Sequence, residues 1–293
     1  MTAERKKGLL FASAGSIFWG SSGIAGQFLL INENIAPEWL TFFRLLCAGF
    51  LLLLLSHFLK GNISTIWKDR RDRRTLLIFS AFGMLGTQYG YFASIRCSNA
   101  PTATILEYLM PILIIFWYCL SEKRWPRTVE IFCALFAITG TALIATGGDF
   151  RSLSISGKAL FWGLLSALAC ALYTVEPVGI IKKYGAPLVV GWGMFLASFV
   201  LLPVVALTPF TGTVDMPVLL SFAYVVLFGT ICSFVLYLGS VAYILPTEAS
   251  IISAIEPLSS IIFSFLIFHL TFDFWELIGM ALIILAVAVV ARK

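Results

Sequence analysis

Apolar residues fill this chain in long continuous runs that are separated by short polar segments. A helix rises about 1.5 Å per residue, so a run of roughly 20 apolar residues crosses the ~30 Å hydrocarbon core of a bilayer. Ten such runs follow one another, at residues 8–31, 41–59, 75–96, 102–120, 129–146, 158–181, 188–207, 218–241, 247–268 and 274–290. They lack the two-residue alternation of a membrane β-barrel. The pattern predicts an all-α polytopic membrane protein with ten transmembrane helices.

The composition agrees with a bilayer as the main solvent of the chain. Of the 293 residues, 60% are hydrophobic and only 12% are charged, whereas about a quarter are charged in soluble domains. The first run follows Arg5, Lys6 and Lys7, as a cleaved secretory signal would. It is longer than a signal core of about 7 to 15 residues and has no convincing cleavage site, so we expect it to remain as the first span.

Basic residues predict the orientation, because short loops rich in Lys and Arg stay on the cytoplasmic side. With the N-terminus inside, the outer segments hold only Arg96, Arg151 and Lys158. We therefore expect a multi-pass protein of the cytoplasmic membrane with both termini in the cytoplasm. The run KDRRDRR at residues 68–74 fits a topology anchor better than an anionic-lipid or nucleic-acid patch, and no other feature indicates nucleic acid as a partner.

The cysteines and histidines form no recognisable site. The six cysteines are scattered without a C-x-x-C spacing, and His57 and His269 lie near opposite membrane faces on this topology. No phosphate loop, metalloprotease helix or nucleophile elbow occurs. The sequence therefore predicts no metal site, no cofactor and no enzyme activity.

An internal repeat relates the two halves of the chain. A shift of 146 residues aligns Phe82–Gly83 with Phe228–Gly229, Tyr91 with Tyr237, and Pro111 with Pro257. Each half then holds five spans: residues 1–148 form the first unit, 149–156 the connector and 157–293 the second unit. Because five is odd, the second unit enters the membrane from the opposite face, which is the inverted repeat of many transporters. This geometry favours transport over a structural role.

Five stretches resemble the two-repeat EamA family of the drug/metabolite transporter superfamily. They are IFWGSSG (17–23), APEWLTFFRLLCAGFLLLLL (36–55), SNAPTATILEYLMPIL (98–113), SEKRWPRTVEIFCALFAITGTALI (121–144) and ILPTEASIISAIEPLSS (244–260). The resemblance implies ten helices in two inverted five-helix repeats, with a central substrate cavity and alternating access. The first four helices of each repeat would line the path, while the fifth and tenth would pack or dimerise, giving a homodimer. The sequence departs from the family at Phe268 and His269, where no acidic residue matches Glu122.

Charged residues within the predicted spans are candidate site residues, because a charge near the bilayer centre is costly unless it faces a cavity or a partner. Glu256 lies near the midplane, and Pro257 beside it permits the helix to bend. Arg44 and Glu107 lie at similar depths below the outer face, where they would form either a gate or a static salt bridge. Glu176 lies near the cytoplasmic end, so snorkelling to water explains it as well as a site role.

Aromatic and amide side chains add further candidates at cavity depth. Trp19, Tyr91, Tyr108, Tyr173 and Tyr237 could hold an ammonium group by cation–π attraction, although packing or lipid contact explains each one alone. Gln88 and Ser253 offer uncharged hydrogen-bonding groups.

The sequence therefore predicts a secondary transporter that moves a small polar or amphipathic metabolite, such as an amino acid, an amine or a related compound. Its partners would be this small molecule and the lipid bilayer. A multidrug or toxic-compound exporter is the alternative within transport. A membrane scaffold or sensor that transports nothing is the alternative of another class.

Overall fold

The computed structural model describes residues 3–60, 62–121, 123–149, 154–240, 243, 244, 252, 253 and 255–291, and every element in this part of the chain is helical. The first half contains α1 (Ala3–Gln27), η1 (Phe28–Asn32), α2 (Pro37–Lys60), η2 (Thr65–Trp67), α3 (Arg70–Ile78), η3 (Phe79–Met84), α4 (Leu85–Cys97), α5 (Ala100–Glu107), α6 (Met110–Ser121) and α7 (Thr128–Thr146). The second half contains α8 (Gly157–Val175), α9 (Val178–Tyr184), α10 (Ala186–Leu207), α11 (Met216–Val226), η4 (Leu227–Cys232), α12 (Ser233–Ser240), α14 (Ile255–Phe268) and α15 (Phe274–Ala291).

Seven stretches of the described chain are long and apolar enough to cross a membrane, so the fold is that of a polytopic helical membrane protein. They are Glu4–Asn32, Pro37–Leu59, Ala100–Ser121, Thr128–Thr146, Gly157–Val175, Ala186–Leu207 and Met216–Tyr237. The predicted span 75–96 is occupied by the end of α3, by η3 and by α4, and the predicted span 247–268 falls partly outside the described residues. The count of ten therefore stays a prediction. Glu122, Arg151, Met1 and Lys293 also lie outside the described residues.

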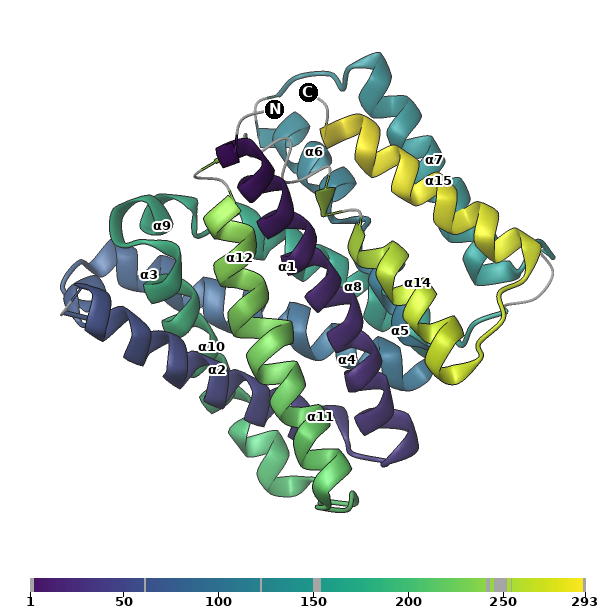
Figure 1. The fold of residues 1–293 in the computed structure, drawn as a ribbon. Coiled ribbons are helices and arrows are strands. Elements are labelled where there is room, and N and C mark those ends of the chain that lie inside the picture. The colour runs from purple at the N-terminus through teal and green to yellow at the C-terminus, as the bar shows by residue number, and fades with distance from the viewer. Residues whose placement is uncertain are drawn as a thin grey trace.

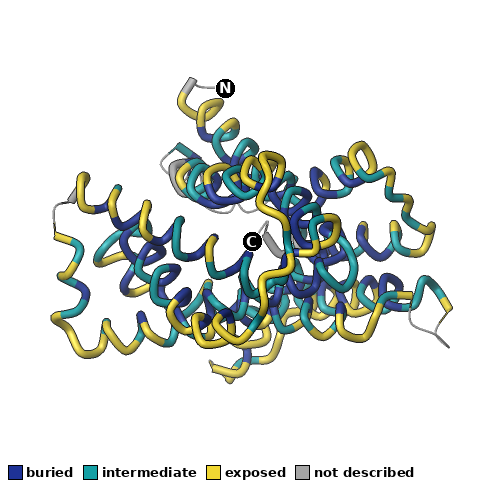
Figure 2. The backbone as a smooth tube through the Cα atoms, turned by 90° about the horizontal axis from the view of Figure 1, so that it is seen from below, coloured by how far each residue is buried: buried dark blue, intermediate teal, exposed yellow. Residues whose placement is uncertain are grey.

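The two halves interlock by exchanging their first helices. In Figure 1, α1 crosses the centre of the bundle and packs against α12 and α14 of the second half. Correspondingly, α8 packs against α4 and α5 of the first half, while α2 pairs with α10 and α7 pairs with α15. In the view of Figure 1, the start of α1 and the end of α15 lie toward the same end of the bundle, and Figure 2 shows them apart from each other at that end. An even number of membrane crossings would place them so.

Glycines at corresponding positions of the two halves permit this exchange. The π-helical segments η3 and η4 contain Gly83 and Gly229, the pair that the internal repeat aligns. A Cβ on Gly83 would lie 3.0 Å from the Cα of Tyr173 on α8, and one on Gly229 would lie 2.2 Å from the Cβ of Ser22 on α1. Each π-segment therefore sits directly against the first helix of the other half.

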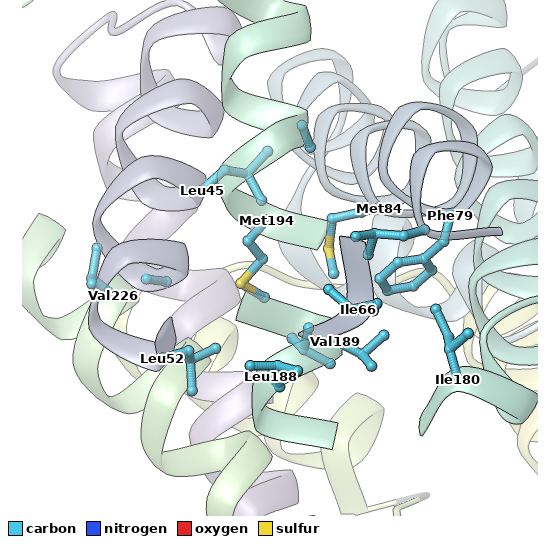
Figure 3. Close-up of a cluster of buried hydrophobic side chains, with 14 residues drawn as sticks. Leu45, Leu52, Ile66, Phe79, Met84, Ile180, Leu188, Val189, Met194 and Val226 are labelled. Atoms are coloured by element: carbon cyan, nitrogen blue, oxygen red, sulfur yellow. The ribbon is translucent and has the colours of Figure 1, made fainter. Parts of the chain in front are cut away.

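A buried apolar cluster joins the halves on one side of the bundle. Leu45 and Leu52 of α2, Phe79 of η3 and Met194 of α10 all point into it (Figure 3). Elsewhere, buried positions face the interior and exposed positions face outward (Figure 2). Many exposed side chains are large and apolar, Leu207 of α10 among them at 87% exposure. A soluble monomer rarely carries so much exposed apolar surface, whereas lipid covers it without cost.

Two sets of polar contacts join the halves at the chain segments predicted to lie on opposite membrane faces. Within the predicted inner segments, Lys183 Nζ and Tyr184 Oη donate to Asp72 Oδ2 at 2.6 and 2.7 Å. This bond to Asp72 raises the pKa of Lys183 above the ordinary lysine value, so the Lys183 amine is protonated at neutral pH. Within the predicted outer segments, Thr211 donates to the Asn34 carbonyl at 2.7 Å. In both places a residue just after the first predicted span of one half contacts the segment between the second and third predicted spans of the other half.

The closest approach of α7 and α15 generates a test of this packing. A Cβ on Gly140 would lie 2.6 Å from the Gly279 carbonyl oxygen, so Gly140→Ala should push the helices apart and destabilise the protein by about 1–3 kcal/mol. The matched control is Gly179→Ala on α9, where no atom lies within 4 Å of the added Cβ. Melting temperatures in detergent measure both variants. Equal melting temperatures would contradict the close approach.

Candidate functional site

A cavity of about 510 Å³ lies at the centre of the bundle, between helices from both halves. Its wall contains most of the side chains that the sequence singles out as site candidates: Trp19, Arg44, Gln88, Tyr91, Glu107, Tyr108, Tyr173, Tyr237, Ser253 and Glu256. Pro257 and Glu176 do not line it. Residues from α1, α2, α4 and α5 therefore meet residues from α8, α12 and the start of α14 around one space.

Interrupted helices bring polar groups to this space. Asn99 caps α5 by accepting from the Thr102 amide, and the helix ends at Glu107. A turn at Tyr108 separates α5 from α6 because Pro111 lacks the amide proton that would bond the Glu107 carbonyl. The second half repeats the arrangement, with a turn at Ser253 before Pro257.

The two interruptions contact each other across the cavity. Pro257 has no amide proton to donate to the Ser253 carbonyl. This carbonyl instead accepts a hydrogen bond from the Glu256 amide at 2.9 Å and one from the Tyr108 hydroxyl at 2.5 Å. Pro257 is buried in the first turn of α14, so its part in the site is to shape this break. A carbonyl freed within the membrane is thereby satisfied by the opposite half.

Glu107 and Glu256 face the cavity from these two breaks. Glu107 Oε2 accepts from the Ser166 hydroxyl of α8 at 2.5 Å. Glu256 lies beside Tyr108 and Tyr237 and is close enough to Glu107 and Arg44 to interact with both electrostatically. One cation and two carboxyl groups therefore share this space.

Arg44 does not form the expected ion pair with Glu107. Its Nε donates to Thr230 Oγ1 at 2.9 Å and its Nη2 to the Gly229 carbonyl at 3.4 Å, and the guanidinium lies 5.1 Å from the centroid of the Phe92 ring. No carboxylate lies within 4.0 Å of Arg44 in the described part of the chain. The similar depth of the two residues stays a prediction, although both line the cavity. Depth gives no direction around the helix, and the π-segment η4 presents acceptors where Arg44 points.

Aromatic rings form much of the remaining wall. Trp19 of α1 packs against Tyr237 and Phe234 of α12, with ring centroids 5.1 and 5.4 Å away. The Tyr91 hydroxyl bonds Thr104 at 3.0 Å. Thr87 and Gln88 also line the cavity, but Thr87 Oγ1 and Gln88 Oε1 are buried against protein and have no hydrogen-bond partner among the described residues. The wall thus offers ring faces and the carboxyl groups of Glu107 and Glu256 to a bound molecule.

Several residues of the cavity wall are not among the site residues predicted from the sequence. Thr104, Cys170 and Phe234 are uncharged, but each lies three residues before a predicted site residue, namely Glu107, Tyr173 and Tyr237. Helical periodicity puts residues three apart on one face, so this spacing could have found them. Glu176 instead follows the end of α8, next to Pro177, which precedes α9. The described residues contain no group of three His, Cys, Asp or Glu side chains placed to hold a metal ion.

The contacts of Arg44 generate a prediction. In the double variant Arg44→Glu/Glu107→Arg, the exchanged charges should not restore the melting temperature lost by each single variant, because neither residue binds the other. Thr230→Val should destabilise the protein by about 1–3 kcal/mol, since it leaves Arg44 Nε without its acceptor.

Thr141→Val is the matched control, because that hydroxyl bonds only the Ala137 carbonyl of its own helix. Melting temperatures in detergent compare the four variants and this control. Full recovery in the double variant would show that Arg44 and Glu107 do pair.

Comparison with known proteins adds independent evidence. The EamA-like transporter family matches residues 6–146 and 157–292 as two copies. The chain is 38% identical to the inner membrane transporter YicL of Salmonella typhimurium over 98% of this chain and 95% of YicL. It is 26% identical to the transporter YdeK of Bacillus subtilis over 89% of this chain and 87% of YdeK.

A solved crystal structure has a similar fold, with a TM-score of 0.62 at 16% identity over 97% of this chain and 96% of the other. The helical fold, the two matched copies and the extensive identity to YicL agree. The chain belongs to the EamA-like transporter family and is a membrane transporter.

Proposed function

We propose that the protein is a secondary transporter that works by alternating access and carries a small polar or amphipathic metabolite across the cytoplasmic membrane. Ten helices form the two inverted repeats, residues 1–148 and 157–293, joined by residues 149–156. Both termini lie in the cytoplasm. The central cavity is the observation that carries the proposal, because both halves supply its wall and its ionisable groups.

The exchanged first helices support the inverted arrangement. The contact of α1 with η4 has a counterpart in the contact of α8 with η3. The polar contacts at Asp72 and Asn34 likewise repeat each other at chain segments predicted to lie on opposite faces. Two halves related in this way can open one side of a shared site while closing the other.

The chemistry of the wall favours a substrate that carries an amine. Arg44 is occupied by acceptors of η4, so it is less available for an anion. Glu256 lies in the cavity wall, and Trp19 and Tyr237 add ring faces. A protonated amine fits such a wall, because carboxylates and aromatic faces both attract a cation.

The energy for transport comes from a gradient or from exchange, because the sequence has no nucleotide-binding motif. Glu256 and Glu107 are the groups able to carry a proton. A charge within the membrane is costly, so either carboxyl group gains by taking a proton or a cationic substrate.

Flux in proteoliposomes tests the role of Glu256. With an imposed pH gradient and a panel of radiolabelled amines and amino acids, Glu256→Gln should abolish the uptake of any transported compound or make it independent of pH. The matched control is Glu176→Gln, which removes a carboxylate of another predicted span that does not line the cavity. It should retain pH-dependent flux.

Unchanged pH-dependent uptake in Glu256→Gln would remove the proton-carrier role. A scaffold or sensor predicts a different result, namely no flux and no thermal stabilisation by any compound of the panel. Export differs from import only in the direction of the productive gradient, so the same vesicles distinguish a multidrug exporter from an uptake system.

A further inference from the structure

A second, apolar groove of about 270 Å³ adjoins the central cavity. Its wall comes from three helices: Leu52, Leu55 and Leu59 of α2, Pro187 and Val190 of α10, and Phe234 and Val235 of α12. Leu59 is 69% exposed and Val235 is 46% exposed, so the groove opens on the surface that lipid covers.

Helix packing explains the opening. In the described part of the chain, α2 packs along α10, whereas α12 packs against α1 and makes little contact with α2 or α10. A wedge therefore remains between α12 and the α2–α10 pair. Leu59 lies near the end of α2 and Pro187 near the start of α10, so the wedge lies toward the end of the bundle where Lys183 contacts Asp72.

The partition between groove and cavity is thin. Val190 and Phe234 belong to the walls of both spaces. On the cavity side, the Phe234 ring packs edge-on against Trp19 with centroids 5.4 Å apart. A change of the Phe234 rotamer requires no movement of the backbone, so this ring is a movable part of the partition.

We propose that the groove receives the hydrocarbon tail of the substrate while the central cavity holds its amine. The substrate class is then an amphipathic amine with an unbranched alkyl tail, which enters from the bilayer between α12 and the α2–α10 pair. This inference rests on the proposed function and specifies its substrate. The groove shares the wall residues Val190 and Phe234 with a polar cavity, and this distinguishes it from a groove that only holds lipid.

The physical basis is the difference in lining between the two spaces. The groove wall is apolar throughout, so it offers dispersion contacts and no hydrogen-bond partner to a ligand. The cavity wall holds the carboxyl groups of Glu107 and Glu256. A molecule with one charged end and one apolar end satisfies both walls together, and neither a fully polar nor a fully apolar molecule does.

A series of primary n-alkylamines from butylamine to octylamine tests the inference. Binding is measured by titration calorimetry on the full chain in lipid nanodiscs of constant composition, so that partition into lipid is the same for every variant. In the wild type, affinity should rise by up to about fourfold for each methylene that enters the groove. Val235→Trp, which fills the groove, should reduce this gain to the part that partition into lipid contributes.

Two further variants control the comparison. Val204→Trp adds the same bulk at a valine of equal exposure, 46%, on α10 outside the groove, and it should keep the gain with tail length. Leu55→Trp fills the groove from the α2 wall and should have the same effect as Val235→Trp. With two groove-filling variants, the test still works if one of them does not fold. Melting temperatures identify any variant that has lost its fold.

The outcomes separate this inference from the proposed function. Glu256→Gln should weaken every amine of the series by the same factor and preserve the dependence on tail length. Wild-type affinity that is independent of tail length, or a full gain retained in both groove-filling variants, would overturn the inference and leave the groove to bilayer lipid. If Glu256→Gln leaves the affinity unchanged and the dependence on tail length intact, the result would instead count against Glu256 as the group that binds the amine in the proposed function.

Discussion

The bilayer interior offers no water to a charge or to a broken helix, and the centre of this protein is arranged around that constraint. Helix breaks before Pro111 and Pro257 free backbone carbonyls at membrane depth. The Ser253 carbonyl at the break of the second half accepts a hydrogen bond from Tyr108, which lies at the break of the first half. The two interruptions therefore meet, and the residues around their meeting point line the cavity.

The same constraint explains the hydrogen bonds of Arg44. A guanidinium within the membrane needs acceptors, and the π-segment η4 provides them through the Gly229 carbonyl and the Thr230 hydroxyl. A π-segment widens the helical hydrogen-bond ladder, which leaves carbonyl groups available to side chains. Gly229 in the same segment allows α1 to approach closely. The π-segment η4 therefore both binds the Arg44 guanidinium and contacts a helix of the other half.

Much of the fold and the composition of the cavity wall can be predicted from the sequence. Apolar runs identify helices because length and hydropathy decide what crosses a membrane. Depth identifies Glu107 and Glu256 as groups that must face inward. The partner of Arg44 cannot be predicted in this way, because it depends on the angular position of η4. The groove beside Phe234 cannot be predicted from the sequence either, because it depends on how the helices pack. It exists because α12 packs against α1 and makes little contact with α2 and α10.

The exchange of first helices determines which parts can move together. In sequence, α1 belongs to the first half, but it packs against α12 and α14 of the second, and α8 packs against α4 and α5 of the first. Since Gly83 and Gly229 let these helices pack closely, sliding each half as a unit would break these contacts. For the proposed alternating access, we therefore expect the units of motion to be mixed bundles, one built on α1 and one on α8. The cavity lies between them, with Trp19 on one bundle and Tyr173 on the other.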